Sequence, residues 1–220
     1  MEHSVTSENL ALDRQGLHQI VVDRLRKLIV EGRLEAGSRI NEKALCEQLQ
    51  ISRTPLREAL KVLANEKLVE LLPNRGAKVV LLSDREIAEA FEVMARLEAI
   101  SGELACERIT QPELDEIHAL HYEMLACYTR KDLPGYYDIN MRIHALISKA
   151  ARNELLQDLY QRVNFRIQSL RFRSNFDETE WAESVQEHTE LLEALTKRDG
   201  ARAAAVLHLH LTKKQRKLKL

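Results

Sequence analysis

The chain has 220 residues, of which 45% are hydrophobic and 30% are charged, with a formal net charge of −1. This composition is typical of a globular protein with one large or two modest cores. No apolar stretch approaches the roughly 20 residues that span a bilayer, and the N-terminus does not have the pattern of a signal peptide. Three widely spaced cysteines (Cys46, Cys106 and Cys127) argue against a disulfide framework or a cysteine-rich zinc site. We therefore expect a cytoplasmic protein that is neither secreted nor anchored to a membrane.

The net charge conceals a difference between two parts of the chain. Residues 12–80 contain 13 Lys or Arg against 9 Asp or Glu, a net charge of +4, which leaves −5 for the remainder. A basic N-terminal part favours a nucleic-acid partner at that end of the chain. The asymmetry alone is equally compatible with a chain that binds no nucleic acid.

Few glycines and prolines, and long runs of Leu, Ala, Glu, Arg and Lys, predict helix over most of the chain. The exception is residues 69–81, where a Pro-Asn-Arg-Gly turn separates two short β-prone runs and predicts a hairpin. Before it, two short helices begin at the N-caps Asn41 and Ser52 and are joined by a tight turn. This order predicts a winged helix-turn-helix over residues 12–82. The three predicted helices are 17–31, 41–48 and 52–65.

After the hairpin, capping boxes at Ser83 with Glu86 and at Thr110 with Glu113 mark new helix starts. Six helices follow with short connections, which predict antiparallel neighbours in a bundle over residues 83–220. The expected fold class is therefore mainly α, with three helices and a β-hairpin wing followed by an all-α six-helix bundle. The six predicted helices cover residues 84–108, 111–129, 134–150, 153–172, 178–197 and 200–217.

The third predicted helix has two distinct faces. Its apolar residues recur at helical spacing, whereas Arg53, Thr54 and Arg57 project from the other side. The first turn of a recognition helix enters the major groove, where arginine donates to guanine and serine or threonine reaches phosphate. The turn Asn74-Arg75-Gly76 would then form a wing tip that reaches a minor groove or a phosphate. The alternative is a solvated helix face. The apolar stripe is Leu56, Ala59, Leu60 and Leu63, and Lys61 lies on the charged side.

The segment from residue 32 to residue 80 closely resembles the DNA-binding domain of the GntR family, above all in SRTPLREAL followed by PNRGAKV. The resemblance implies that Arg53 and Arg57 contact bases or phosphates and that Gly76 contacts DNA from the wing. Lys43 stands where the family often has an arginine. The partner is then a double-stranded DNA operator. The expected DNA-binding residues are Lys43, Ser52, Arg53, Thr54, Arg57, Arg75 and Gly76.

Histidines are the notable chemical groups of the second part. His188 falls within a stripe of apolar residues on its helix, and Asn140 lies four residues before His144 on a shared face. The last helix offers His208 and His210 on different faces, and periodicity does not choose between them. For any one of these histidines, the ordinary interpretation is a hydrogen-bonded core residue.

Residues 84–217 resemble the FCD effector domain of the FadR subfamily, and six helices resemble its shorter, VanR-like group. In that family an Asp or Asn, a His four residues later, a His opening an H-x5-A-L pattern and a His 22 residues further on ligate a divalent metal. Here the pattern falls on Asn140, His144, His188 and His210. Three imidazoles and one oxygen suit zinc, nickel or manganese.

The match to the family pattern has departures. Ile143 replaces the usual Phe, and Asn140 in place of Asp removes a negative charge, which should weaken or retune the metal site. Met94 occupies the position of an expected arginine, with Arg96 two residues further on.

Three further residues are candidates for contacts with an effector. His121 could line the cavity, although a core histidine is the simpler interpretation. Arg171 and Arg173 could supply charge to an acidic effector, although their place at a helix end favours solvation. Arg171 and His121 are our candidate effector-binding residues.

These expectations combine into a ligand-responsive regulator that is not an enzyme. We expect a homodimer that binds a palindromic operator and represses a metabolic operon in response to a small organic acid. One alternative is a metal-dependent enzyme tethered to DNA, although no general base accompanies the histidines at a recognised spacing. Another is a ligand-free architectural DNA-binding protein.

Overall fold

A computed structural model describes residues 14–73 and 75–217, and the chain divides into two compact units. The first contains Arg33–Val80 and the helix that precedes it up to Ile29, and the second contains Leu81 onward together with Val30–Gly32. Asn74 of the expected wing tip and the outermost residues of the chain lie outside the described residues.

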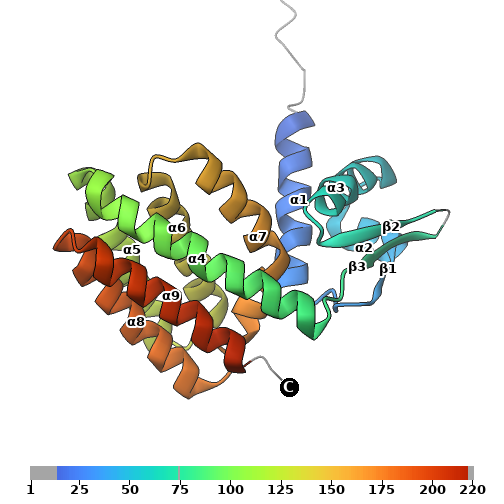
Figure 1. The fold of residues 1–220 in the computed structure, drawn as a ribbon. Coiled ribbons are helices and arrows are strands. Elements are labelled where there is room, and N and C mark those ends of the chain that lie inside the picture. Colours follow the sequence, from blue (N-terminus) through green and yellow to red (C-terminus); the bar gives the residue numbers. More distant parts are fainter. Residues whose placement is uncertain (1–13, 74, 218–220) are drawn as a thin grey trace, which may run out of the picture. The chain divides into compact units, whose positions relative to one another are not determined.

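The first unit has the helices and the hairpin of a winged helix-turn-helix (Figure 1). Its sheet has the strand order β1-β3-β2, and both pairings are antiparallel. Strand β1 is two residues long and was not predicted, because so short a segment becomes a strand only through its long-range pairing with β3. The elements are α1 (Arg14–Val30), β1 (Arg39–Ile40), α2 (Glu42–Leu49), α3 (Arg53–Asn65), β2 (Val69–Leu72) and β3 (Gly76–Val79).

The core of this unit explains why its elements form where they do. The predicted apolar stripe of α3 is buried and packs with apolar residues of α1 and of the sheet. Helix α2 begins at Asn41, whose side chain accepts a hydrogen bond from the backbone N–H of Ala44 at 3.1 Å. It ends at Gln50, which adopts the left-handed conformation at φ 54°. The cluster includes Val22, Leu25, Leu56, Leu60, Leu63 and Val79.

The second unit is a bundle of six helices in its described part, as predicted (Figure 1). Both predicted capping boxes are present, at Ser83 with Glu86 and at Thr110 with Glu113. The observed helices lie within two residues of their predicted ends. They are α4 (Asp84–Arg108), α5 (Gln111–Thr129), α6 (Leu133–Ala150), α7 (Glu154–Arg173), α8 (Glu178–Thr196) and α9 (Gly200–Lys217).

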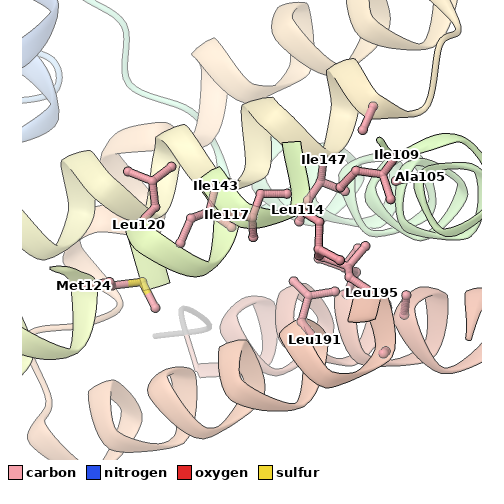
Figure 2. Packing of buried hydrophobic residues seen from close by; sticks show 14 of the residues in the cluster. Ala105, Ile109, Leu114, Ile117, Leu120, Met124, Ile143, Ile147, Leu191 and Leu195 are labelled. Atoms are coloured by element: carbon pink, nitrogen blue, oxygen red, sulfur yellow. The ribbon is translucent and has the colours of Figure 1, made fainter. Parts of the chain in front are cut away.

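Helix α4 runs beside α9 and also packs against α6 and α7 (Figure 1). Gly102 permits the close approach of α4 to α9, because a Cβ at this position would lie 2.5 Å from Cδ1 of Leu207. Apolar side chains from α4, α5, α6, α8 and α9 form the main hydrophobic core of the bundle (Figure 2). Its residues include Leu114, Ile117, Leu120, Met124, Ile143, Ile147, Leu191 and Leu195. Among the described residues, no helix is long and apolar enough to cross a membrane.

Candidate DNA-contact surface and metal centre

The first turn of α3 presents polar side chains to solvent. Arg53, Thr54 and Arg57 are exposed, on the side of the helix opposite its buried stripe. Ser52 occupies the N-cap position, but its side chain makes no capping hydrogen bond. Its hydroxyl is therefore available to a ligand. The side chain of Asn41, in contrast, accepts the capping hydrogen bond of α2.

The tertiary structure places α2 and the wing beside this turn. The Nε atom of Arg57 donates to Oε2 of Glu42 at 3.0 Å, so Glu42 orients the guanidinium group. Gly76 has φ +77°, and a Cβ there would lie 3.2 Å from Oε1 of Glu42, so both its conformation and its surroundings favour glycine. Lys43 is exposed, and its Nζ lies 4.0 Å from Oε1 of Glu47. Glu42 is a positioning residue that the sequence did not single out.

Five of the seven expected DNA-binding residues line one hollow, which we call the α3 hollow. Its volume is about 340 Å³. Residues distant in sequence, from Lys43 to Gly76, thus meet at the first turn of α3, while Ser52 and Thr54 are exposed beside it on the same turn. The hollow is lined by Ile40, Asn41, Glu42, Lys43, Arg53, Arg57, Arg75 and Gly76.

In the bundle, α6, α8 and α9 bring together His144, His188 and His210. One ring nitrogen from each lies within 4.8 Å of the others, and all three side chains are buried. Ring centroids are 5.1 Å apart for His144 and His188, and 5.4 Å apart for His188 and His210. His208, the other candidate on α9, is exposed, so the structure makes the choice that periodicity left open.

Two carboxylates fix the orientation of two of these rings. Nδ1 of His210 donates to Oε2 of Glu187 at 2.6 Å, and Nδ1 of His144 lies 3.1 Å from Oε2 of Glu98. The Nε2 atoms of all three histidines are buried and have no hydrogen-bond partner. A carboxylate on one ring nitrogen and a free lone pair on the other is the arrangement of histidine metal ligands.

Electrostatics keep the rings in the form that binds metals. Burial lowers the pKa of His144, His188 and His210; Glu98 opposes this lowering at His144 and His210, and Lys214 adds to it at all three. Burial alone would raise the pKa of Glu98, but the Arg171 guanidinium and His144 outweigh it and hold this pKa at about 2. The cluster therefore consists of neutral imidazoles beside an ionised carboxylate. These donors fit a divalent ion that prefers nitrogen ligands.

The remaining expected site residues have separate positions. Asn140 is buried one helical turn before His144 on α6. His121 is buried, its Nε2 lies 3.5 Å from the hydroxyl of Thr189, and it lies outside the cluster of three. Met94 is fully buried, and Arg96 is an exposed residue paired with Glu92.

The expectation that solvent surrounds Arg171 is wrong. Arg171 is 1% exposed, and its Nη1 lies 3.0 Å from Oε1 of Glu98 and donates to Asn164 at 3.0 Å. Its Nε and Nη2 atoms are buried without hydrogen-bond partners of good geometry, while Glu98, Tyr160 and Tyr137 raise the pKa of the guanidinium group against the effect of burial. Helix α7 turns this side inward by packing on α4, whereas Arg173 two residues later is exposed.

Three buried charged residues near the histidines were not predicted from the sequence: Glu98, Glu187 and Lys214. Nζ of Lys214 donates to Ser174 at 3.0 Å, Asn175 at 2.9 Å and Ser184 at 3.2 Å, all neutral acceptors. A signal for each was present: Glu98 falls in the apolar stripe of α4, Glu187 directly precedes His188, and Lys214 follows His210 by four residues.

Comparisons with known proteins agree with this geometry. The family model described as bacterial regulatory proteins of the gntR family matches residues 17–79, and the FCD domain model matches residues 89–213. The HTH-type transcriptional repressor RspR of Escherichia coli K12 is 24% identical over 94% of this chain and 91% of its own length. The galactonate operon transcriptional repressor of the same organism is 28% identical, over 90% and 95%.

Among solved structures, Escherichia coli McbR/YncC superposes with a TM-score of 0.79 at 23% identity, covering 90% of this chain and 94% of the other. That likeness shows a shared fold. The gntR model covers the residues of the α3 hollow, and the FCD model covers the three clustered histidines. Their family is one of DNA-binding transcriptional regulators, not of enzymes. The chain belongs to the GntR family of bacterial transcriptional regulators and carries an FCD domain.

Proposed function

We propose that this regulator binds a palindromic operator as a homodimer and represses a metabolic operon until a small organic acid binds beside a metal ion in the bundle. The observation that carries the proposal is the group of three buried imidazoles whose Nε2 atoms have no partner. A structural core would leave few such nitrogens unsatisfied, since each costs about 1–3 kcal/mol. The names of RspR and the galactonate operon repressor favour repression.

At the operator, Arg53 and Arg57 would supply base or phosphate contacts, and Ser52, Thr54 and Lys43 phosphate contacts. Their exposure at the first turn of α3, with Arg75 and Gly76 lining the same hollow, supports this assignment. Half-sites about one helical turn apart, or closer, suit a dimer of such domains.

In the bundle, His144, His188 and His210 would hold zinc, nickel or manganese, with Asn140 as an oxygen donor. When bound, the ion would supply a positive centre that attracts an acidic oxygen of the effector. Because all four donors are neutral, they would leave the charge of the ion uncompensated. Glu98 and Glu187 already contact Arg171 and Lys213. The uncompensated positive charge of the ion would favour an anionic effector.

Arg171 would provide a second point of recognition for the acid. Its buried Nε and Nη2 donors lack hydrogen-bond partners of good geometry, as does the buried Nε2 of Gln168 one turn earlier on α7. The space beside the histidines is narrow and is also lined by Leu191 and Leu207. An effector that enters must move side chains of α8 and α9. Such movement would make the effector bind the two states of the protein unequally. A difference of roughly 1–3 kcal/mol couples the effector site to the operator site.

A second copy of this chain would cover exposed apolar residues of α4 and α7. Val93 and Ile100 lie seven residues apart on α4, and Leu155 and Leu159 lie four apart on α7, which packs against α4. Each protomer would offer the same patch to its partner, as a two-fold dimer requires. Light scattering of the purified protein should give twice the chain mass, and Ile100→Glu should give the monomer mass.

The proposal is tested by selecting sheared genomic DNA on the purified protein at about 150 mM salt, where purely electrostatic binding is weak. We expect a palindromic sequence to be recovered beside a metabolic operon, and the acids handled by that operon to release the duplex. Trp181, which packs edge-on against Tyr128 and Tyr136, provides a fluorescence signal for effector entry. Capture without sequence preference would contradict operator recognition, and specific binding that no acid alters would contradict the sensing role.

A further inference from the structure

The outer face of the three-stranded sheet carries a row of charged side chains. Strand pairing places Arg39 of β1 opposite Lys78 of β3, and Lys78 opposite Glu70 of β2. Their neighbours Ile40, Ala77 and Val79 are buried, so the alternation of a strand turns the charged residues away from the core. The sheet therefore exposes a basic row that recognition by α3 does not use.

The row carries more positive than negative charge, because Glu70 lies opposite Lys78 while Arg39 lies opposite a second cation. Like charges at directly opposed positions of two strands destabilise a sheet. Within the described part of the chain, no ion pair joins Arg39, Arg75 or Lys78 to an acidic group. The row itself has two cations, Arg39 and Lys78, and one anion, Glu70, and Arg75 in the turn between β2 and β3 adds a third cation. An external anion would relieve this repulsion.

The row lines a hollow that shares one lining residue, Arg75, with the α3 hollow. This wing hollow has a volume of about 610 Å³. Arg75 lines both the wing hollow and the α3 hollow, so its side chain is shared by the two. The wing hollow is lined by Gly37, Arg39, Glu70, Leu72, Pro73, Arg75 and Lys78.

We propose that the wing hollow is a second phosphate-binding surface, in which Arg39 and Lys78 hold the DNA backbone beyond the base pairs that α3 reads. The inference rests on operator binding through α3. A guanidinium group and an ammonium group on neighbouring strands suit phosphate oxygens, and such contacts fix position on the duplex without reading sequence. Arg75 connects the two surfaces, so one stretch of backbone can pass from α3 to the sheet.

The test uses full-length protein and the duplex recovered by genomic selection. Arg39→Gln and Lys78→Gln should each weaken binding about fivefold and reduce the slope of log affinity against log salt by about one for each phosphate that is no longer neutralised. The ratio of affinities for the selected and a scrambled duplex should stay unchanged. Ethylation of individual phosphates should identify backbone positions that matter for the parent protein and not for the double variant.

Arg24→Gln on α1 is the matched control, because it removes one exposed positive charge from the same unit. It should leave both the affinity and the salt slope close to those of the parent. A double variant Arg39→Gln/Lys78→Gln with parental affinity, slope and interference pattern would overturn the inference. In that case Arg57→Ala would still weaken binding to the selected duplex, so operator recognition by α3 would stand. A parent protein that selects no duplex would instead refute the proposed function.

Discussion

The two units use arginine–glutamate pairs in opposite ways. In the first unit, Arg57 pairs with Glu42 while 63% of the arginine side chain is exposed. In the bundle, Arg171 pairs with Glu98 and both side chains are at most 2% exposed. Solvent screens the first pair, so its arginine remains free to exchange Glu42 for a DNA group. Solvent does not reach the second pair, so neither residue can exchange its partner for water. Arg171 therefore keeps the buried Glu98 carboxylate charged beside the histidines.

The largest expected effect follows directly from this contrast. Arg171→Met leaves the Glu98 carboxylate buried without its cation, and should lower the free energy of unfolding by about 3–5 kcal/mol. Arg57→Met should change it by less than about 1 kcal/mol but should weaken operator binding by about 1–3 kcal/mol. Urea unfolding followed by circular dichroism, with the fluorescence of Trp181 as a probe of the bundle, measures the two stabilities. Equal losses of stability in the two variants would contradict the difference between the buried and the solvent-exposed pair.

The carboxylates beside the histidines should affect metal affinity. Glu187→Gln and Glu98→Gln should each weaken binding of zinc by about 10- to 100-fold, because the ring nitrogen loses an ionised acceptor that orients it. Glu193→Gln, on the exposed side of α8, is the control. Titration of zinc into chelator-treated protein gives the affinities. Unchanged affinity in both variants would mean that these carboxylates do not orient metal ligands.

Lys214 should make the stability of the metal-free bundle depend on pH. Burial lowers its pKa from 10.5 to about 7, assisted by Arg171 and opposed by Glu187, Glu180 and Glu98. Between these two pH values the unfolded chain binds a proton that the folded chain does not, so stability rises with pH through this window. The rise from pH 7 to 8.5 should be about 1.5 kcal/mol. Lys214→Met should remove it in urea unfolding, and the same rise in both proteins would assign it to another group.

The smallest effect compares two N-cap positions of the first unit. Asn41→Ala should cost about 1 kcal/mol of stability, because Ala44 loses its hydrogen-bond acceptor. Ser52→Ala should leave stability unchanged, because Ser52 makes no capping bond. It should instead weaken operator binding if its hydroxyl reaches a phosphate. Thermal unfolding and binding to the selected duplex separate the two roles, and a stability loss at Ser52 would show that it caps α3.

The sequence predicted the two units unequally. Four of the expected DNA-binding residues lie within a short run, from Ser52 to Arg57, and helical spacing alone separates those of α3 from its buried stripe; only the fold brings Lys43, Arg75 and Gly76 beside them. The bundle ligands lie on α6, α8 and α9, and only their resemblance to a family pattern joined Asn140, His144, His188 and His210. Periodicity did not choose between His208 and His210, because each has apolar neighbours along the helix.

The sequence by itself determined the helices, the hairpin, the capping boxes and the two-faced α3, because these depend on residues within a few turns of one another. Only the tertiary structure decided that Arg171 is buried, that β1 pairs with β3, and that Glu98 and Glu187 orient His144 and His210. The sequence shows how far a polar residue of a helix lies from the apolar residues of the same helix. Whether it meets solvent or a partner depends on how other helices pack across it, which residues distant in the chain determine.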